Sequence, residues 1–254
     1  MLKVTTNYFG KIGMETQKNI SDQAKKNYSA NTPWPNADEW HSKTFQAINN
    51  IVNKELAKFD NENAIILNAG SGGTNYNHKG RFIHLDIIES YINKYPNYIV
   101  ASIDNIPLES DSVDIIICVG SVINYADCQK SLKEFSRVLK ANGILILEFE
   151  RSNSGEFLFT GNHNKQVFSN SYIYNNQKHI LWMYNEKHVI KIMRCNNLKT
   201  IRKYRFHTFS TLLYRLGLSE KSAAKYIKAD KIFAPISYPL AHNCILISKK
   251  ISKV

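Results

Sequence analysis

The chain has 254 residues, of which 43% are hydrophobic and 21% charged, an ordinary globular balance and enough for one sizeable domain. No apolar run reaches the roughly 18 residues of a membrane helix, and the N-terminus lacks the long apolar core of a signal peptide, so we expect neither. The formal net charge is +12, and residues 151–254 carry most of the excess, with 18 Lys and Arg against 4 Asp and Glu.

This charge asymmetry indicates either a surface for nucleic acid or another polyanion, or a solvated lysine-rich face, and the scattering of the lysines favours the second. The four cysteines lie far apart and form no C-x-x-C pair. That spacing argues against a zinc site, so no metal is expected, and it suggests reduced thiols in a cytoplasm.

Residues 1–35 are polar and predict little structure. A helix is predicted next, over "EWHSKTFQAINNIVNKELAKF", with Asn36 or Asp38 as its cap and apolar residues from Trp40 to Phe59 on one face. Residues 28–50, which include Trp34 and Trp40, are a candidate lid.

Five short apolar runs then predict buried strands: 64–69, 81–87, 99–104, 113–121 and 144–150. A helix is predicted between the last two, with Gly143 at its end and an apolar stripe that reads as core: Leu132, Phe135, Val138 and Leu139. Strands that alternate with helices indicate parallel pairing and an α/β sheet.

After residue 150 the regular alternation of predicted strands and helices ends. "VFSNSYIYNN" and "HILWMYNEKHVIKIMRC" predict antiparallel strands, "KTIRKYRFHTFS" a strand, "TFSTLLYRLGL" and "EKSAAKYIKAD" helices, and "NCILISKK" a last strand, plausibly an antiparallel edge. The aromatic residues here either line an acceptor pocket or, as we favour, form the core of an insertion: Phe157, Phe159, Tyr172, Tyr174, Trp182 and Tyr184.

The stretch "LNAGSGGTNY" places Gly70, Gly72 and Gly73 directly behind the first predicted strand. Glycines there let a ligand approach the main chain. Asp86 ends the second strand, where a carboxylate can accept both hydroxyls of a ribose. Asp104 follows the third strand beside Asn105 and Ile106, a pairing that suits an adenine.

The segment of about residues 60–150 resembles the class I S-adenosylmethionine-dependent methyltransferases, most of all those that modify small molecules. The most specific matches are "DNIPLESDSVDIII" and "LKEFSRVLKANGILIL". The resemblance implies a doubly wound, mainly parallel, seven-stranded Rossmann-like sheet, with S-adenosylmethionine as the cofactor.

The resemblance also implies roles for individual residues. The implied cofactor-binding set is Asn68, Ala69, Gly70, Ser71, Gly72, Gly73, Tyr76, Asp86, Ile87, Asp104, Asn105, Ile106, Gly120 and Ser121. Asn124 and Tyr125 are expected to face the substrate. Glu148 and Glu150 share one side of the fifth strand, and one of them is a candidate base, although pairing with Arg151 or another cation is the preferred interpretation.

Two departures from the family pattern stand out. Asn68 replaces the acid that the family usually has two places before the first loop glycine. Only residues 74–83 separate Gly73 from His84, too few for the usual long first helix, so "TNYNHKG" is expected to be a loop in which Tyr76 covers the cofactor.

Several alternatives remain at this stage. Asp86 could cap a helix, Asp104 could only start a turn, and Ser121, Asn124 and Tyr125 could be plain loop residues. His163, His188 and His207 are candidate proton acceptors only because imidazole titrates near neutrality. The short loop disfavours a dinucleotide site, and the lack of Gly-Lys-Ser/Thr excludes a Walker loop.

We therefore predict an N-terminal helical segment or lid over residues 1–60 and a methyltransferase domain over residues 61–254, with an insertion at about 155–200. The reaction expected is methyl transfer to an oxygen, nitrogen or carbon of a small molecule. A nucleic-acid methyltransferase and a non-catalytic cofactor-binding module are the alternatives, and the oligomeric state is not readable from the sequence.

Overall fold

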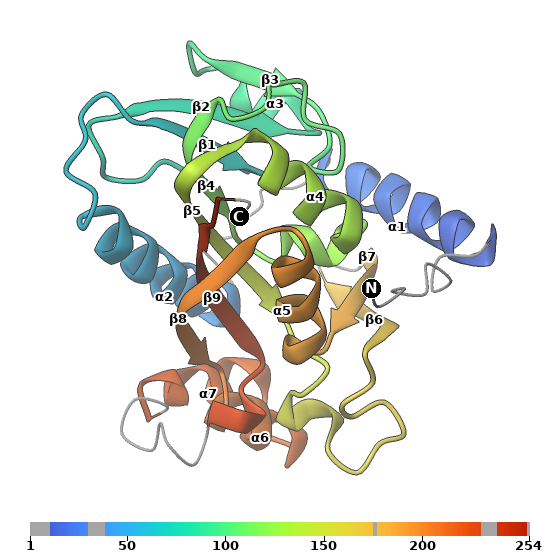
Figure 1. The fold of residues 1–254 in the computed structure, drawn as a ribbon. Helices are drawn as coiled ribbons and strands as arrows, with labels where there is room; N and C mark the ends of the chain where they lie inside the picture. Colours follow the sequence, from blue (N-terminus) through green and yellow to red (C-terminus); the bar gives the residue numbers. More distant parts are fainter. Residues whose placement is uncertain (1–10, 30–38, 175–176, 230–237, 253–254) are drawn as a thin grey trace.

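The structure is a computed structural model that describes residues 11–29, 39–174, 177–229 and 238–252. Its central sheet has seven strands in the order β3-β2-β1-β4-β5-β9-β8 (Figure 1). The strand bounds are β1 Ile65–Ala69, β2 Arg81–Asp86, β3 Tyr98–Val100, β4 Val113–Cys118, β5 Leu139–Glu150, β8 Leu198–Phe206 and β9 Asn243–Lys250.

The five strands from β1 to β5 pair in parallel, and β9 runs antiparallel to both β5 and β8. The doubly wound, mainly parallel sheet predicted from the sequence is therefore confirmed. The last strand is antiparallel as expected, but the expectation that it forms an edge is wrong, because β9 lies between β5 and β8.

Each face of the sheet is covered by helices. On one face, Ile66, Ile115 and Ile146 pack against α2 (Glu39–Leu56), the helix predicted after the polar N-terminus. On the other face, Leu67, Ile116 and neighbouring residues pack with α4 (Cys128–Val138) and α5 (Glu186–Cys195). The predicted apolar stripe of α4 is confirmed as core.

The prediction that Gly143 ends a helix is wrong. Helix α4 stops at Val138, and β5 begins at the next residue. Val113 pairs with Leu139, the register then shifts, and Ile115 pairs with Ile144, so residues 140–143 bulge out of the ladder. Gly143 is needed for close approach, because a Cβ there would lie 2.9 Å from the carbonyl oxygen of Asp114.

No helix connects β1 to β2, as the short segment predicted. Residues 70–80 run as turns and extended chain between the two strands. Helix α2 precedes β1 in the chain and covers the face of the sheet that contains Ile66 and Ile115. It does so through three fully buried side chains, Ile48, Val52 and Leu56. Burial of such side chains stabilises the fold by about 1.5–3 kcal/mol each.

The segment after β5 forms a two-stranded hairpin of β6 (Val167–Tyr174) and β7 (Gln177–Tyr184). The predicted antiparallel strands are therefore present, but the strand interpretation of residues 186–195 is wrong. Asn185 caps a helix there, α5, by accepting a hydrogen bond from the backbone N–H of Lys187. The buried residues Val189, Ile190 and Met193 recur at helical spacing.

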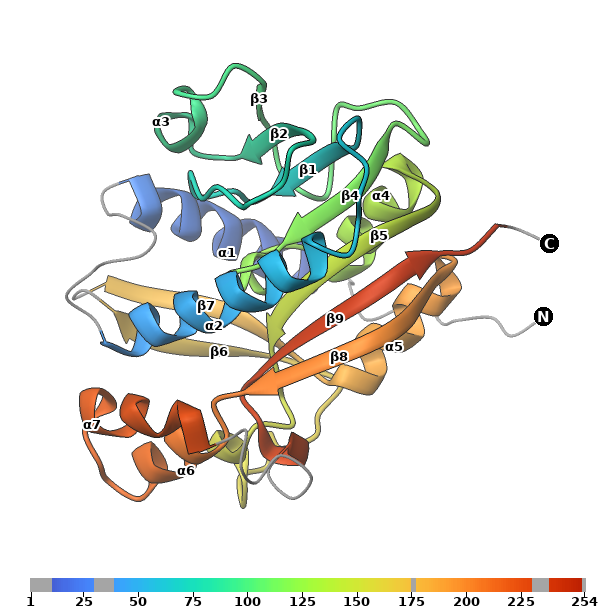
Figure 2. The ribbon, with the colours of Figure 1, turned by 90° about the vertical axis from the view of Figure 1, so that its left-hand side faces the viewer.

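Figure 2 shows α1, α2, the β6–β7 hairpin and the C-terminal helices on the side to which the parallel strands point. The remaining helices are α1 Lys11–Ser29, α3 Glu89–Ile92, α6 Phe209–Arg215 and α7 Glu220–Ala224, and the 3-10 turns are η1 Val122–Tyr125, η2 Gly155–Phe157, η3 Lys225–Lys228 and η4 Tyr238–Leu240. The carboxyl ends of the strands, where such folds bind ligands, are therefore enclosed.

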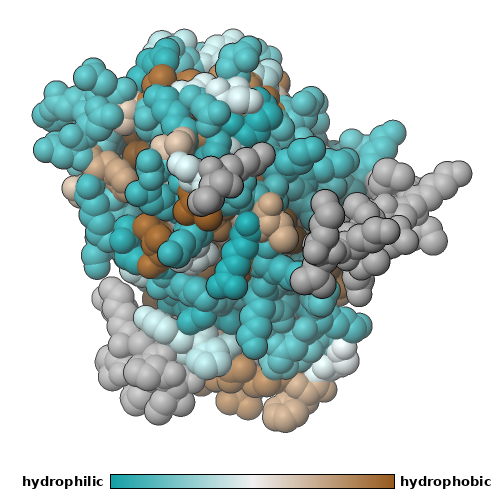
Figure 3. Space-filling model, viewed as in Figure 1, coloured by the Kyte–Doolittle hydropathy of each residue, from teal (hydrophilic) through white to brown (hydrophobic). Residues whose placement is uncertain are grey.

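Hydrophilic residues cover most of the face seen in Figure 3, and the hydrophobic patches on it are small and separated. Within the described ranges, no helix is long and apolar enough to cross a membrane.

Candidate functional site

The glycine turn after β1 requires glycine at two places for steric reasons. Gly70 has a φ of +70°, and a Cβ there would lie 2.4 Å from Cγ1 of Val122. Gly73 has a φ of +72°, and a Cβ there would lie 2.7 Å from the carbonyl oxygen of Tyr91. At these two positions the turn therefore carries no side chain, and at Gly70 its backbone packs closely against Val122 in the turn that follows β4.

Backbone and amide hydrogen bonds hold this turn in place. The N–H groups of Gly70 and Ser71 both donate to the carbonyl oxygen of Leu85 on β2, at 2.8 and 3.0 Å. The Asn68 Nδ2 donates to the carbonyl oxygen of Thr74 at 2.8 Å and to Oγ of Ser71 at 3.2 Å. The amide at position 68 therefore orients the loop through donors that a carboxylate lacks.

Asp86 at the end of β2 faces the same turn. Its Oδ2 accepts a hydrogen bond from the N–H of Gly72 at 2.7 Å, and its Oδ1 accepts one from the N–H of Ile88 at 3.0 Å. Burial raises the pKa of Asp86, and these backbone donors oppose the shift. A carboxylate has about four lone-pair sites, so Asp86 can still accept hydroxyl groups from a ligand.

A cavity of about 340 Å³ starts at Asp86 and runs across the carboxyl ends of the strands. One end is lined by Asp86, Ile87, Tyr91, Ala101, Ser102 and Ile103, and the middle by Gly70, Ser71, Gly72, Gly120 and Ser121. The rest of the lining includes Tyr125, Glu150, Glu156, Tyr172, His179 and His242. Tyr28 connects the two groups, because its carbonyl oxygen accepts from the Tyr91 hydroxyl and its own hydroxyl hydrogen-bonds to that of Tyr125. The size of the cavity is that of a small-molecule site.

Glu148 fixes the turn after β4 at the middle of this cavity. Its Oε2 accepts hydrogen bonds from the N–H groups of Gly120 and Ser121, at 2.9 and 2.6 Å, and its Oε1 accepts one from Nδ2 of Asn243 at 2.7 Å. Burial raises the pKa of Glu148 to about 7, although these donors oppose the shift. Ser121 has a φ of +57°, a left-handed conformation that the paired N–H groups hold.

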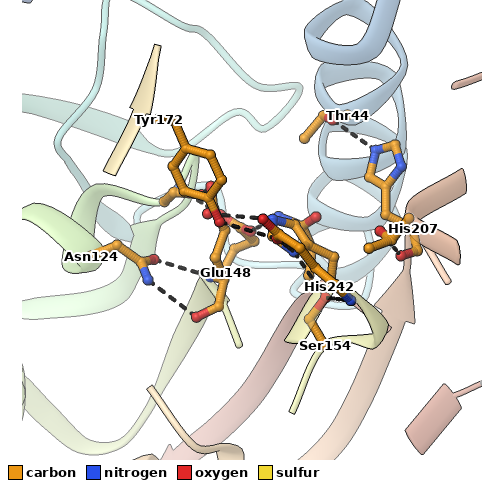
Figure 4. Close-up of polar contacts among 12 residues, drawn as sticks. Thr44, Asn124, Glu148, Ser154, Tyr172, His207 and His242 are labelled. Carbon is orange, nitrogen blue, oxygen red and sulfur yellow. Dashed lines mark hydrogen bonds and ion pairs between the residues drawn. The ribbon is translucent and has the colours of Figure 1, made fainter. Parts of the chain in front are cut away.

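Asn124 ties the end of β5 to the hairpin. Its Oδ1 accepts a hydrogen bond from the N–H of Glu150 at 3.0 Å, and its Nδ2 donates to the carbonyl oxygens of Glu150 and Trp182, at 3.1 and 2.6 Å (Figure 4). Asn124 is completely buried. Through these bonds Asn124 fixes the backbone of Glu150 and so positions its side chain.

At the far end of the cavity, an imidazole lies between two carboxylates. His242 Nε2 is 3.3 Å from Oε2 of Glu150, and His242 Nδ1 is 3.3 Å from Oε2 of Glu156. The Tyr172 hydroxyl donates to Oε2 of Glu156 at 3.1 Å, and Oγ of Ser121 donates to Oε1 of Glu150 at 2.9 Å. Figure 4 shows Tyr172 and His242 turned toward each other.

These contacts set the charge states of the three groups. Burial acts to lower the pKa of His242, but Glu150 and Glu156 outweigh it and raise that pKa above its ordinary value. Burial acts to raise the pKa of Glu150, but His242 and Ser121 outweigh it and lower that pKa. Burial raises the pKa of Glu156, with His242 opposing.

Sequence comparison gives a family for the central part of the chain. Residues 69–147 match the family model described as a methyltransferase domain. Over 68 residues, or 26% of its length, the chain is 44% identical to the ubiquinone/menaquinone biosynthesis C-methyltransferase UbiE of Campylobacter jejuni. The match spans only 29% of that relative's length.

Residues 69–147 are therefore similar to a methyltransferase domain. They contain the glycine turn, Asp86 and the turn after β4.

Solved structures share the fold at low sequence identity. The 1,6-didemethyltoxoflavin-N1-methyltransferase of Burkholderia thailandensis, bound to 1,6-didemethyltoxoflavin and S-adenosylhomocysteine, superposes with a TM-score of 0.58 at 10% identity, over 93% of this chain and 91% of that one. The [4+2]-cyclase SpnF gives 0.60 at 11% identity, over 92% and 97%. These likenesses extend the fold of the methyltransferase domain beyond residues 69–147.

S-adenosylmethionine is the methyl donor of this family, and the cavity suits it. Among the described residues that line the cavity there is no Lys or Arg to bind a pyrophosphate, whereas Asp86, Glu150 and Glu156 suit a sulfonium cation and ribose hydroxyls. No helix starts behind the glycine turn, which also disfavours a dinucleotide. The described residues contain no group of three or more His, Cys, Asp or Glu able to hold a metal.

The structure brings eleven of the residues singled out from the sequence to the cavity of the methyltransferase domain. They are Asn68, Gly70, Ser71, Gly72, Tyr76, Asp86, Ile87, Gly120, Ser121, Tyr125 and Glu150. Tyr28 and Trp40 from the candidate lid also line it, whereas Trp34 lies outside the described residues. Asp86 also accepts from the N–H of Ile88, but Ile88 is itself the N-cap residue of α3 and no side chain caps that helix, so Asp86 is not its cap. Its contact with a ribose stays a prediction.

The other six predicted site residues lie outside the lining: Ala69, Gly73, Asp104, Asn105, Ile106 and Asn124. Ile106 is buried in the core, and its backbone binds Glu134 and Arg137 of α4. Residues 104–106 directly follow lining residue Ile103, so their place beside an adenine stays a prediction. Of the aromatic residues after 155, Tyr172 lines the cavity, whereas Phe157 packs in the hairpin core and Phe159 is exposed.

Pairing with Arg151 or another cation was the preferred interpretation of Glu148 and Glu150; for Glu150, Arg151 is wrong, but another cationic group, the imidazole of His242 with its raised pKa, is its partner. Adjacent strand residues point to opposite faces, so Arg151 instead forms an ion pair with Glu186 at 3.3 Å, and the imidazole of His242 takes its place beside Glu150. None of His163, His188 and His207 lines the cavity. His207 binds Thr44 and Ser210 and stacks on Trp40.

Sequence reasoning missed His242 and Glu156. One signal was present: His242 directly precedes the last strand, and an antiparallel strand beside β5 brings its beginning next to the end of β5. Glu150 pairs with Asn243 in this register.

Proposed function

We propose that the chain transfers a methyl group from S-adenosylmethionine to a small molecule. One observation carries the proposal: a single cavity joins the glycine turn and Asp86 to a polar end built from the hairpin, η2 and the residue before β9. A cofactor at the first end and an acceptor at the second can meet near Gly120 and Ser121.

When bound, S-adenosylmethionine supplies an electrophilic methyl group on a good leaving group, so the protein chiefly has to align the acceptor and exclude water. Helix α1 contributes to both. Gln17 donates through Nε2 to the carbonyl oxygen of Tyr125 at 2.9 Å and accepts from Nε1 of Trp182 at 2.6 Å. We infer that residues 1–60 cover the methyltransferase domain of residues 61–254, with an insertion at about 155–200.

The acceptor end offers Tyr125 and Glu150 as groups that touch a substrate, with Asn124 positioning Glu150. Burial raises the pKa of Tyr125 well above its ordinary value, so its hydroxyl stays protonated and acts as a hydrogen-bond donor or acceptor. The named methyltransferase relatives act on unlike acceptors, one on a heterocycle nitrogen and one on a carbon in quinone biosynthesis, so they do not set the acceptor atom.

A small-molecule acceptor is favoured over nucleic acid by the placement of the basic residues. Arg202 pairs with Glu55, and both Lys203 and Arg205 pair with Glu186, so part of the basic excess is internal to the fold. Within residues 11–29, 39–174, 177–229 and 238–252, no Lys or Arg lines the cavity. RNA or DNA binding that falls steeply with salt would restore the nucleic-acid interpretation.

Calorimetric titration tests the proposal. S-adenosylmethionine and S-adenosylhomocysteine are expected to bind one per chain, and NAD is expected to give no heat. Asp86→Ala is expected to weaken S-adenosylhomocysteine binding about tenfold or more, because hydrogen bonds to a charged group contribute about 1.5–3 kcal/mol. Asp104→Ala is the matched variant, and an unchanged affinity there removes Asp104 from the site.

The outcomes separate the candidates. No heat with either methyl compound contradicts the proposal. Binding of both, without methyl transfer to any member of a broad panel of small molecules, supports the non-catalytic module instead. The cytoplasmic location suggested by the cysteines stays a proposal, and Cys118, Cys128 and Cys244 are buried free thiols.

A further inference from the structure

The polar end of the cavity is rich in hydrogen-bond acceptors. Glu150 and Glu156 line it with His242 between them. Oε2 of Glu156 accepts from Tyr172, whereas its Oε1 has no hydrogen-bond partner among the described residues. The Glu156 side chain is 20% exposed, so this oxygen is within reach of a ligand.

A second acceptor at this end is also unpaired. Asn243 lines the cavity and is 3% exposed, and its Nδ2 donates to Glu148. Its Oδ1 is buried without a hydrogen-bond partner in the described part of the chain. A buried polar atom left unpaired costs about 1–3 kcal/mol, so a nearby ligand that donates would be favoured.

The side-chain charges at this end of the cavity also favour a ligand that donates hydrogen bonds. Two carboxylates face one imidazole, and the part of the lining that the structure describes contains no Lys or Arg. Arg215 of α6 is not a lining residue, but its Nη1 donates to the backbone carbonyl oxygen of Glu156 at 3.0 Å, and its positive charge acts to lower the pKa of the Glu156 carboxyl, against the burial that raises it. His41 also lines the cavity and acts on Glu150 electrostatically.

Aromatic rings complete the enclosure. Tyr28 of α1 lies edge-on to Tyr125 and to His179, with ring centroids 5.7 and 5.6 Å apart. The faces of aromatic rings attract cations, most strongly when desolvated. Acidic groups with aromatic walls are a combination that suits an organic cation.

We propose that the acceptor is an amine, bound as a hydrogen-bond donor to Glu156 at the polar end of the cavity. This rests on the proposed function and names the class of its substrate. Glu156 is the specificity-determining residue. An acceptor carrying a carboxylate or phosphate near its reacting atom is disfavoured, because it would face the two carboxylates of Glu150 and Glu156, which outnumber the single imidazole of His242 between them.

The transfer balances with groups that are present. The ammonium form of the amine gives one proton to the Glu156 carboxylate, and the nitrogen lone pair that is freed forms the N–CH₃ bond as the S–CH₃ bond breaks and the sulfonium becomes a neutral thioether. A primary ammonium thus becomes a secondary ammonium, and the proton on Glu156 passes to solvent after product release.

The test uses three probes of one shape: benzylamine, benzyl alcohol and benzoate. Each is titrated by calorimetry into the full chain saturated with S-adenosylhomocysteine, and into the Glu156→Gln variant. Benzylamine is expected to bind at least about tenfold more tightly than benzoate, and Glu156→Gln to weaken it about tenfold, as loss of a charge-assisted hydrogen bond implies. Glu62→Gln, in an exposed pair with Lys79, is the control.

The amine proposal is overturned by equal binding of benzylamine and benzoate, by no binding of any probe, or by unchanged benzylamine binding in Glu156→Gln. Retained affinity of that variant for S-adenosylhomocysteine shows that the fold is intact. Failure of the wild-type chain to bind S-adenosylhomocysteine instead overturns the proposed function.

Discussion

Replacing Gly70 with Ala tests the role of the glycine turn. A Cβ at this position would lie 2.4, 2.6 and 2.9 Å from three carbon atoms of Val122, all well inside normal contact. The φ of +70° adds a cost of about 1 kcal/mol or more for a non-glycine residue. Overpacking of this kind costs about 1–3 kcal/mol, so we expect a total loss of about 2–4 kcal/mol.

Urea unfolding followed by circular dichroism measures the change. Gly161→Ala is the matched control, because a Cβ there meets nothing within 4 Å. Val122→Ala removes two of the three clashing carbon atoms, so Gly70→Ala/Val122→Ala is expected to recover part of the loss, and the double-mutant cycle isolates the contact. Equal stability of Gly70→Ala and Gly161→Ala would refute the steric argument.

Three further predictions follow from the polar contacts. Although burial acts to raise the pKa of Glu186, its ion pairs lower that pKa to about 2, which stabilises the fold by about 3 kcal/mol. This stabilisation should be present above pH about 4.5 and be lost as the pH falls toward 2. Glu186→Gln should therefore lower the urea midpoint at pH 7 far more than at pH 3, and an equal loss at both would contradict this. Asn68→Asp should weaken S-adenosylhomocysteine binding severalfold in calorimetry, because it removes the donor to Thr74, whereas tighter binding would show that the family's acid is preferable here. His242 has a raised pKa, so its contact with Glu150 should stabilise the fold below pH about 6.5, and this stabilisation should be lost as the pH rises through the pKa of His242 in the folded protein. The difference in urea midpoint between wild type and His242→Gln should therefore become smaller as the pH rises. A difference that does not change with pH would exclude this linkage.

The glycine turn and Asp86, which we propose hold the cofactor, could be placed together from the sequence because they lie close together in the chain. Gly70 to Gly73 follow β1, and Asp86 ends the neighbouring parallel strand, so the spacing of two short apolar runs was enough to bring them together. The missing helix between β1 and β2 was likewise readable from the length of the segment.

The acceptor half was not predictable in the same way. Glu150, Glu156 and His242 meet only because β9 inserts antiparallel beside β5, and the sequence suggested an edge strand there. The bulge at residues 140–143 was also missed, because a glycine after a helical pattern reads as a helix end. Here the tertiary pairing of Ile115 with Ile144 decides the conformation.

A crystal structure of the chain with S-adenosylhomocysteine tests the central claim most directly. The account predicts the ribose hydroxyls within hydrogen-bonding distance of the Asp86 carboxylate, with the homocysteine part along Gly70 to Gly72 and its sulfur directed toward Ser121. Adenosine bound elsewhere, or an Asp86 side chain turned away from the ribose, would contradict it.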